Sequence, residues 1–359
     1  MLFALPPDDT LYDALVARDP HFDGRAFVGV TSTGIFCRLT CPARKPKREN
    51  CRFFESVSAC LEAGFRACKR CHPLTPSADV DPSVAHLINA LAADPGRRWT
   101  EADVAALGLD PSTVRRAFRR HYGMTFLKMA RLSRVKTGMK AMSSGARVVD
   151  AQFEAGYESA SAFRAAFARL LGDSPARFTG RESLKADILD TPMGPMLAVC
   201  DDTHLHLLEF AERKALKPEL ARLRKAVNGD LGVGRTPITE QIECELNRFF
   251  AGEDARFETP LALHGTDFTQ RVWTELRSIP AGATRSYGEV ARAIGQPTAT
   301  RAVARANGAN QIAIVIPCHR VIGADGTLTG YGGGLWRKQS LIDLERRYAA
   351  GNTEGRAAS

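Results

Sequence analysis

The sequence predicts a multidomain protein in which a small α+β domain, an all-α domain, and an α/β subdomain followed by a mainly helical domain come in that order. Three observations support this fold class. A chain of 359 residues exceeds one ordinary hydrophobic core. Two close pairs of cysteines lie within the first 76 residues, and a helical segment after residue 82 is repeated at an offset of 49 residues.

Overall charge and cysteine content restrict the class of protein. There are 49 basic against 40 acidic residues, so the net charge is +9 and the protein should be attracted to polyanions. The first nine residues lack a basic segment, and no hydrophobic run is long enough to span a membrane. Nine cysteines without a secretion signal argue for metal-binding or catalytic thiols rather than disulfides. We therefore expect a soluble, cytoplasmic protein with no membrane partner.

In the first predicted domain, residues 1–76, four cysteines have the spacing of a tetrahedral zinc site. The pattern is C-x3-C, a long gap, then C-x2-C, which lets two tight turns each present two sulfurs to one Zn²⁺. The four ligands are Cys37, Cys41, Cys68 and Cys71. Cys51 and Cys60 lie in the gap outside any close pair, and we expect them to be packing residues. On spacing alone, the zinc could serve only to hold a small domain together.

Basic residues surround the cysteine pairs and suggest a second role for the metal. A zinc held by four thiolates carries net negative charge and repels a DNA backbone, whereas the basic side chains attract it. Alkylation of one sulfur would remove one negative charge. The basic residues are Arg38, Arg44, Lys45, Lys47, Arg48, Lys69 and Arg70.

The segments Thr33-Gly34-Ile35-Phe36-Cys37-Arg38-Leu39-Thr40-Cys41-Pro42-Ala43-Arg44 and Ala63-Gly64-Phe65-Arg66-Ala67-Cys68-Lys69-Arg70-Cys71 closely resemble the amino-terminal module of the bacterial Ada family. The resemblance implies that Cys37, bound to zinc, accepts a methyl group from DNA methylphosphotriesters. It further implies that methylation of Cys37 converts the protein into a tighter DNA binder. We expect Arg38, Arg44 and Arg48 to contact DNA.

Residues 82–181 are predicted to form a helical domain, after a Pro-, Ser- and Asp-rich linker at about 73–82. Val84, Leu87, Ile88 and Leu91 form one apolar helix stripe.

The internal repeat indicates two helix-turn-helix units in this domain. Residues 117–125 are echoed by 166–174, and each unit reads as helix, glycine-containing turn, helix. The candidate recognition helices are 111–120 and 159–169, with Val114, Phe118, Phe163 and Phe167 facing inward. The candidate DNA contacts are Arg115, Arg116, Arg119 and Arg164. Without the repeat, two helical hairpins with solvated arginines would explain the pattern equally well.

The stretch Gly156-Tyr157, Ser161-Ala162-Phe163, Phe167, Gly172 and Pro175 resembles the AraC-type DNA-binding domain, which carries two such units.

Residues 184–264 are predicted to be a small α/β subdomain that acts as scaffolding. Apolar segments at 196–200 and 204–208 are separated by turn residues. We expect His204 and His206 to form a surface pair without a carboxylate partner, and Cys200 and Cys244 to be buried.

Residues 265–350 return to a helical pattern. A helix from Thr266 ends near Pro280, and residues 286–295 and 298–306 form another helix-turn-helix-like pair. The second helix of that pair is rich in alanine, so it could approach a DNA groove closely and let Arg301 insert where a nucleotide leaves the stack. An ordinary packing face of small residues is the alternative.

Pro317-Cys318-His319-Arg320 follows the apolar run 312–316, which we expect to be a buried strand. A cysteine is nucleophilic as its thiolate, and a neighbouring imidazole can take the thiol proton directly or through one water. In isolation the dipeptide fits a buried structural cysteine followed by a surface histidine at least as well.

The region from Arg301 through Asn310 and Cys318 to Tyr331-Gly332-Gly333-Gly334 resembles the O6-alkylguanine-DNA alkyltransferase domain, with Ile316-Pro317-Cys318-His319-Arg320-Val321 as its most specific motif. This makes residues 265–350 an expected alkyltransferase domain and places all three modules in Ada order. We expect residues 351–359 to be a flexible tail.

The resemblance implies a role for each site residue. Cys318 is the acceptor, His319 its base through a water, and Glu345 the carboxylate that orients the imidazole. Asn310 braces the turn, Tyr287 helps to flip the base, Arg301 fills the vacated stack, and Lys338 lies near the pocket.

Three functions remain open at this stage. The first is a single-turnover DNA alkylation-repair protein that is also a methylation-switched transcription regulator. The second is a zinc-containing transcription factor whose carboxy-terminal domain only senses damage, and the third is a cysteine hydrolase built on Cys318 and His319. For the first, we expect Zn²⁺ as cofactor, double-stranded DNA as partner, RNA polymerase as a second candidate partner, and a monomer.

Overall fold

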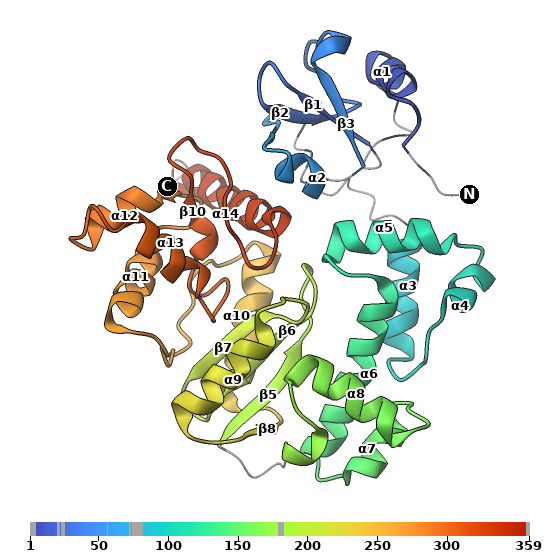
Figure 1. The fold of residues 1–359 in the computed structure, drawn as a ribbon, viewed down its shortest axis with the longest axis vertical. Helices are drawn as coiled ribbons and strands as arrows, with labels where there is room; N and C mark the ends of the chain where they lie inside the picture. The colour runs from blue at the N-terminus through green and yellow to red at the C-terminus, as the bar shows by residue number, and fades with distance from the viewer. Residues whose placement is uncertain are drawn as a thin grey trace.

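The computed structural model describes residues 5–19, 22, 26–55, 57–71, 73, 82–178 and 183–356, and their side chains except at residues 58, 82 and 347–356. Most of the linker expected at 73–82 lies outside these residues. Among the described helices, none combines the length and apolar character needed to cross a membrane. The multidomain organisation is confirmed, with the modules following one another in the colour order of Figure 1.

The amino-terminal domain is a four-stranded sheet in the order β3-β1-β2-β4, flanked by two helices. Its elements are α1 (Asp8–Ala17), β1 (Phe27–Val30), β2 (Ile35–Arg38), β3 (Cys51–Phe54), α2 (Val57–Glu62) and β4 (Arg66–Ala67). β2 and β4 pair in parallel, with Phe36 opposite Ala67. Since one cysteine pair begins at the end of β2 and the other just after β4, this pairing brings the two pairs together.

The helical domain contains the two predicted helix-turn-helix units. Its helices are α3 (Pro82–Ala93), α4 (Glu101–Ala106), α5 (Pro111–Tyr122), α6 (Phe126–Ser143), α7 (Val148–Glu154) and α8 (Ala160–Leu171). Gly108 and Gly156, at matching places in the two turns, have φ of 74° and 68°, a conformation that favours glycine. Asp110 and Ser159 cap α5 and α8 by accepting from backbone amides three residues on. The repeat in sequence is therefore a repeat in structure.

The central sheet has the order β7-β6-β5-β8 and is covered on both faces. Its elements are β5 (Leu184–Leu189), β6 (Met196–Cys200), β7 (Leu205–Phe210), α9 (Leu216–Val227), β8 (Leu231–Val233) and α10 (Pro237–Ala251). Strand β6 is buried at every position, which explains why its sequence is apolar without alternation.

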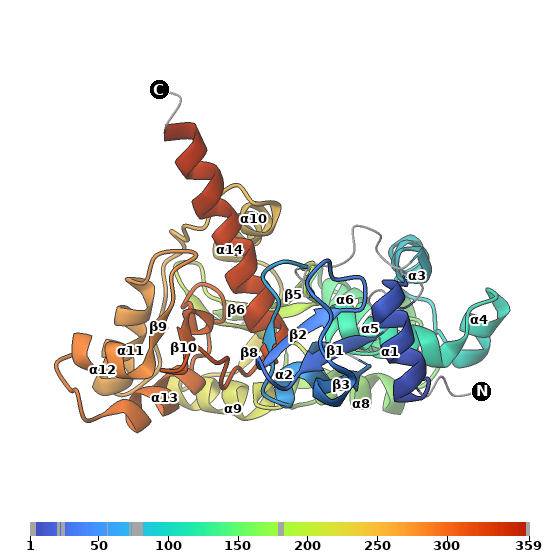
Figure 2. The same cartoon turned by 90° about the horizontal axis from the view of Figure 1, so that it is seen from above.

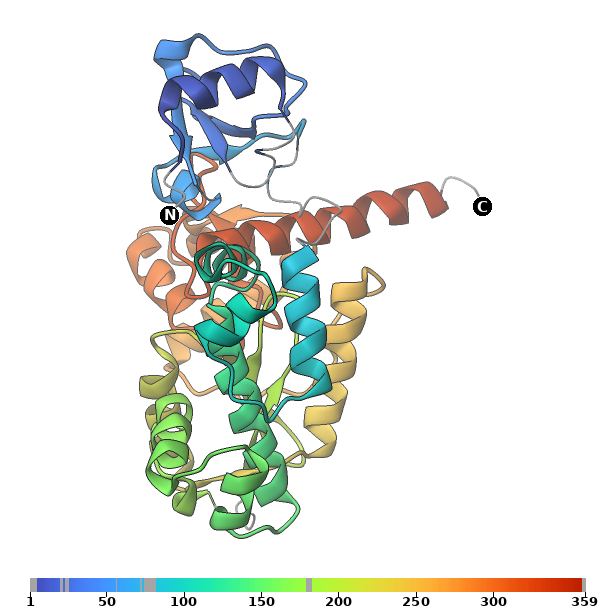
Figure 3. The same cartoon turned by 90° about the vertical axis from the view of Figure 1, so that its right-hand side faces the viewer.

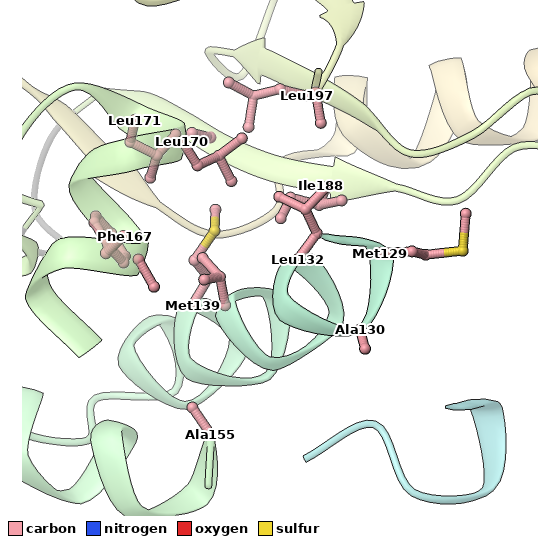
Figure 4. Close-up of a cluster of buried hydrophobic side chains, with 14 of the residues drawn as sticks. Met129, Ala130, Leu132, Met139, Ala155, Phe167, Leu170, Leu171, Ile188 and Leu197 are labelled. Carbon is pink, nitrogen blue, oxygen red and sulfur yellow. The ribbon is translucent and has the colours of Figure 1, made fainter. Parts of the chain in front are cut away.

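One face of this sheet shares a hydrophobic core with the helix-turn-helix domain. Met139 of α6 and Phe167 of α8 belong to the same cluster of buried side chains as Ile188 of β5 and Leu197 of β6, and Figure 4 shows them gathered between the helices and the sheet. The two modules are thus joined by packing.

The last domain packs on the opposite face of the sheet. Its elements are α11 (Asp267–Arg277), β9 (Arg285–Ser286), α12 (Tyr287–Ala293), α13 (Thr300–Gly308), β10 (Val321–Ile322) and α14 (Leu335–Arg356). In Figure 2, α14 extends away from the other elements. Because α14 continues to Arg356, the first part of the tail expected at 351–359 is helical.

The first turns of α14 touch the other modules. Leu335 and Trp336 pack on the apolar cluster of the amino-terminal domain, and α14 contacts α2 along the boundary visible in Figure 3. Arg337, 1% exposed, donates to the carbonyl oxygens of Tyr122 at 2.8 Å and Met193 at 2.7 Å. This arginine therefore ties the end of α5 to the β5–β6 turn.

Candidate active sites

The four paired cysteines form a sulfur cluster suited to a metal ion. The Sγ atoms of Cys37, Cys41, Cys68 and Cys71 all lie within 4.8 Å of one another. Burial raises the pKa of Cys41 to about 11, whereas a hydrogen bond with Cys37 lowers the pKa of Cys71 to about 5. Thiols held this close share protons unless a cation neutralises them. Four sulfurs at tetrahedral spacing fit Zn²⁺.

The basic residues around this cluster are less available than the sequence suggests. Arg44 is exposed as expected. Arg38 is only 8% exposed, because it lies in β2 opposite Phe27. Arg48 pairs with Asp9 at 3.0 Å and Asp8 at 3.5 Å. Arg38 is thus buried and Arg48 is ion-paired in this conformation, and DNA contact by either residue stays a prediction.

On the helix-turn-helix units, the predicted inward and outward faces are confirmed. Val114, Phe118, Phe163 and Phe167 are buried at 3% exposure or less. Arg115, Arg119 and Arg164 are exposed, while Arg116 is half-buried and donates to Thr113 Oγ1 at 3.2 Å.

The run 312–316 before the acceptor motif is buried but is not a regular strand. Only isolated bridges form, between Leu208 and Ile312 and between Ala313 and Ile316, and Ile314 has a φ of 73°. The expected strand is thus wrong. Asn310 stabilises the turn, since its Oδ1 accepts from the Ile312 amide at 3.0 Å and its Nδ2 donates to the Ile316 carbonyl at 2.8 Å.

The thiol of Cys318 lies at the end of this turn and is 7% exposed. Asn310 Nδ2 lies 3.1 Å from its Sγ, so the predicted bracing residue contacts the sulfur directly. Burial raises the pKa of Cys318, while the Asn310 hydrogen bond and the charges of Lys338 and Arg213 act in the opposite direction. Lys338 donates to the carbonyls of Val321 and Thr329, and burial lowers its pKa to about 8.

His319 is fully buried beside Cys318 and is held by a carboxylate. Its Nε2 lies 2.8 Å from Glu345 Oε1, and Arg320 donates to both oxygens of Glu345. Burial lowers the pKa of His319, whereas the neighbouring Glu345 acts in the opposite direction. Burial alone would raise the pKa of Glu345, but His319 and Arg320 lower it to about 2. His319 Nδ1 is buried and has no hydrogen-bond partner among the described residues.

Cys318 opens onto a cavity of about 410 Å³. Tyr287 lies in its wall and donates to the Thr329 carbonyl at 3.4 Å, while Arg301 is exposed on α13, the helix that supplies Ala304 to the same wall. The sequence interpretation gave no role to several lining residues, among them Glu209, Arg213 and Tyr331. No sequence pattern near Cys318 could have identified Glu209 and Arg213, because they lie at the end of β7 and just after it, about 100 residues before Cys318.

Two expectations for the central subdomain are wrong. His206 is 8% exposed, and its ring nitrogens lie 2.8 Å from His264 Nε2 and 2.9 Å from Asp201 Oδ2. It is therefore a buried residue with a carboxylate partner. Cys244 is exposed because it lies on the outer side of α10, while Cys200 is buried as expected.

Three family models match the chain in succession. Residues 10–73 match "Metal binding domain of Ada", residues 104–181 match "Helix-turn-helix domain", and residues 267–347 match "6-O-methylguanine DNA methyltransferase, DNA binding domain".

Two relatives match over nearly the whole length of the chain, and a third matches its last part. The chain is 34% identical to the bifunctional transcriptional activator/DNA repair enzyme Ada of Escherichia coli, over 94% of this chain and 96% of that protein. It is 32% identical to the regulatory protein ada of Salmonella typhimurium, over 95% and 98%. A methylated-DNA–protein-cysteine methyltransferase of Mycolicibacterium paratuberculosis is 51% identical over 41% of this chain and 91% of its own. The chain belongs to the Ada family.

Proposed function

We propose that this chain is a single-turnover methylated-DNA–protein-cysteine methyltransferase and a transcriptional regulator. It moves the methyl group of O6-methylguanine to Cys318 and that of a methylphosphotriester to Cys37. The observation that carries the proposal is the arrangement at Cys318, whose buried thiol opens onto a base-sized cavity beside Asn310 and a His319–Glu345 pair. A hydrolase would have to release its product, whereas a thioether formed here is stable to water.

At Cys318 the proposed step is a direct displacement. The sulfur bonds to the O6-alkyl carbon as the carbon–O6 bond breaks, and that electron pair stays on the guanine. The thiol proton passes through a water to Nδ1 of His319, which has no hydrogen-bond partner among the described residues. The imidazolium then gives this proton back to water and the guanine takes one proton up, so no proton is gained or lost overall. Glu345 holds the other nitrogen of His319 and stabilises the imidazolium that forms.

The cavity requires the base to leave the duplex before reaction. Flipping costs a few kcal/mol, so residues at the cavity mouth must offset it. Tyr287 lines the cavity beside the thiol and is suited to crowd the flipped nucleotide. We assign to exposed Arg301 the filling of the vacated stack, and to Lys338 the support of the loop that carries Thr329.

Cys37 is activated differently. We propose that Cys37, Cys41, Cys68 and Cys71 hold Zn²⁺, which would keep the sulfurs ionised at neutral pH. The Cys37 sulfur takes the methyl carbon, and the broken carbon–oxygen bond leaves a phosphodiester anion. One negative charge thus moves from the protein to the DNA. The cluster then repels the DNA backbone less, so exposed Arg44 can bind a phosphate more tightly. Arg38 and Arg48 could contact DNA only after a rearrangement.

This charge transfer is the basis of the regulatory half of the proposal. Sequence-specific binding falls to the two helix-turn-helix units, with Arg115, Arg119 and Arg164 as outward contacts and Arg116 as a weaker one. Since phosphate contacts dominate affinity, loss of one negative charge near them tightens binding. A zinc-containing transcription factor whose last domain only senses damage is the second candidate.

One experiment separates these functions. The protein is incubated with duplexes carrying labelled O6-methylguanine or labelled methylphosphotriesters, and the label is mapped by peptide mass spectrometry. We expect it on Cys318 and Cys37 respectively, each once per chain. Label on neither cysteine removes the repair function. Unchanged DNA affinity after Cys37 methylation removes the switch alone.

The remaining assignments complete the proposal. We divide the chain at 1–76, 82–181, 184–264 and 265–350, and propose that it acts as a cytoplasmic monomer. None of the nine cysteines, all of which lie in the described residues, forms a disulfide, and this suits a reducing compartment. Double-stranded DNA is the partner, and RNA polymerase the further partner that activation would need.

A further inference from the structure

Arg213 is a buried arginine in the wall of the Cys318 cavity, although it belongs to the other subdomain. It follows β7 directly, and its side chain is 9% exposed. Its Nη1 pairs with Glu209, which is itself 2% exposed, and lies 3.2 Å from Glu219. Burying an arginine between two carboxylates costs desolvation free energy unless the N–H groups of its guanidinium all make hydrogen bonds.

The remaining donors of Arg213 reach the segment that carries the acceptor turn. Nη1 donates to the carbonyl oxygen of Asn310 at 3.0 Å, and Nη2 donates to that of Gly308 at 3.0 Å. Gly308 is the last residue of α13, the helix that also carries Arg301. One guanidinium therefore fixes both the end of this helix and the backbone of Asn310.

Asn310 transmits this position to the sulfur. Its main chain is held by Arg213, while its side-chain Nδ2 lies 3.1 Å from Cys318 Sγ. The path from Arg213 to the reacting atom thus has one intermediate residue. A displacement needs the sulfur in line with the bond that breaks, and a misplacement of about 1 Å can cost roughly 100-fold in rate.

The opposite wall of the cavity is fitted to the guanidinium. A Cβ at Gly332 would lie 2.7 Å from Arg213 Cζ, too close for any real contact. Gly332 therefore leaves the space that Arg213 occupies, and the arginine is held from both sides.

We propose that Arg213 is a positioning residue for alkyl transfer, which acts through Asn310 to hold the Cys318 sulfur in line with the flipped base. Its charge has a second, separable effect on the thiolate. The charged groups that act on Cys318 are Glu209, Arg213 and Lys338, and Arg213 and Lys338 both favour the thiolate. The inference rests on the proposed role of Cys318 as acceptor.

The test separates position from charge. Transfer of label from an O6-methylguanine duplex to Cys318 is timed in single turnover, and the reactivity of Cys318 with iodoacetamide is measured against pH. Arg213→Lys keeps the charge but cannot hold Gly308, Asn310 and Glu209 together. We expect about a tenfold slower transfer with a nearly unchanged pH profile.

Arg213→Gln is expected to slow transfer by roughly 100-fold and to move the pH profile upward, since a cation is lost and Glu209 is left unpaired. Glu209→Gln combined with Arg213→Gln removes both charges, so the pH profile should return toward the parent while transfer stays slow. Arg222→Gln is the matched control, because Arg222 lies 3.9 Å from the same Glu219 but makes no bond to Asn310 or Gly308 among the described contacts.

Two results would overturn the inference. One is a transfer rate in the Arg213→Lys variant equal to that of the parent, since this variant keeps the positive charge but loses the hydrogen bonds. The other is a rate loss in every Arg213 variant that matches only the fraction unfolded, as measured by circular dichroism at the assay temperature. An unmodified Cys318 in the parent protein would instead disprove the proposed function itself.

Discussion

The two proposed acceptor sites of this protein would prepare a thiolate in opposite ways. Cys37 lies in a cluster of four sulfurs within 4.8 Å of one another, where a metal must neutralise the charge. Cys318 lies against Asn310 in a cavity, with His319 and Glu345 behind it and no other cysteine close in sequence. The first site needs no proton acceptor and the second needs no metal. The difference follows the substrates, since a phosphotriester lies on the DNA surface and an O6-alkyl group lies inside the stack.

Zinc removal should separate the sites most strongly. A strong chelator under reducing conditions is expected to abolish methyl acceptance at Cys37 and to unfold the amino-terminal domain, because a small domain of this size depends on its metal. Transfer to Cys318 should stay within about twofold, since its neighbours are protein groups. Mass spectrometry of both peptides and circular dichroism measure this. Recovery of Cys37 acceptance on adding zinc is the control, and acceptance without metal would contradict the scheme.

His319→Gln tests the other side of the comparison. Loss of the base should slow transfer to Cys318 by about 10² to 10⁴-fold, the usual contribution of general base catalysis, and leave Cys37 unchanged. Single-turnover label transfer gives both rates. His204→Gln alters an exposed histidine and serves as control. If the His319 variant reacts at the parental rate, Cys318 is not activated by a base.

The Glu345→Gln variant tests whether the negative charge of Glu345 stabilises the fold around Cys318. The pKa of Glu345 is lowered from 4.5 to about 2, so its contribution to stability is complete above 4.5 and is lost as the pH falls through about 2. The lost stability is about 3 kcal/mol, an order-of-magnitude figure for a carboxylate that is almost fully buried.

Urea unfolding between pH 7 and pH 2 should therefore show parent and Glu345→Gln furthest apart at neutral pH and converging in acid. Glu253→Gln, at an exposed glutamate, should show no such convergence. A constant difference across the range would mean that the charge of Glu345, bonded to His319 and Arg320, contributes nothing.

Arg301→Ala should have the smallest effect. We expect the rate of transfer from duplex O6-methylguanine to Cys318 to fall about tenfold. A loss of this size corresponds to part of the few kcal/mol that base flipping costs. Transfer from single strands and acceptance at Cys37 should change little. Arg305→Ala, one turn later on α13 and also exposed, is the matched control for a lost phosphate contact. Equal losses on duplex and single strand would remove Arg301 from base flipping.

The sequence predicted what depends on local pattern. The helix-turn-helix repeat, the inward faces of α5 and α8, and the convergence of the cysteine pairs all follow from spacing along the chain. The resemblance to the alkyltransferase domain implied that Asn310 is a brace, and Asn310 contacts both the turn and the sulfur.

Two of the differences from expectation share a physical cause, which is a partner far along the chain. Arg48 pairs with Asp9, 39 residues earlier, and His206 meets His264, 58 residues later. The run 312–316 has the composition of a strand, but bonds from Asn310 and the φ of Ile314 turn it back on itself. Residue type predicts burial well, whereas the partner of a buried charge depends on the assembled fold.

The core shared by α6, α8, β5 and β6 determines which fragments of this protein can be stable on their own. If the chain were divided between Phe178 and Ser183, Phe167 and Leu170 on one piece would still lie against Ile188 and Leu197 on the other. The pieces should therefore remain associated, and each alone should expose an apolar surface and aggregate. Production of the two halves as separate reagents would need co-expression or a redesigned sheet face, and genetic complementation between halves becomes an attainable experiment.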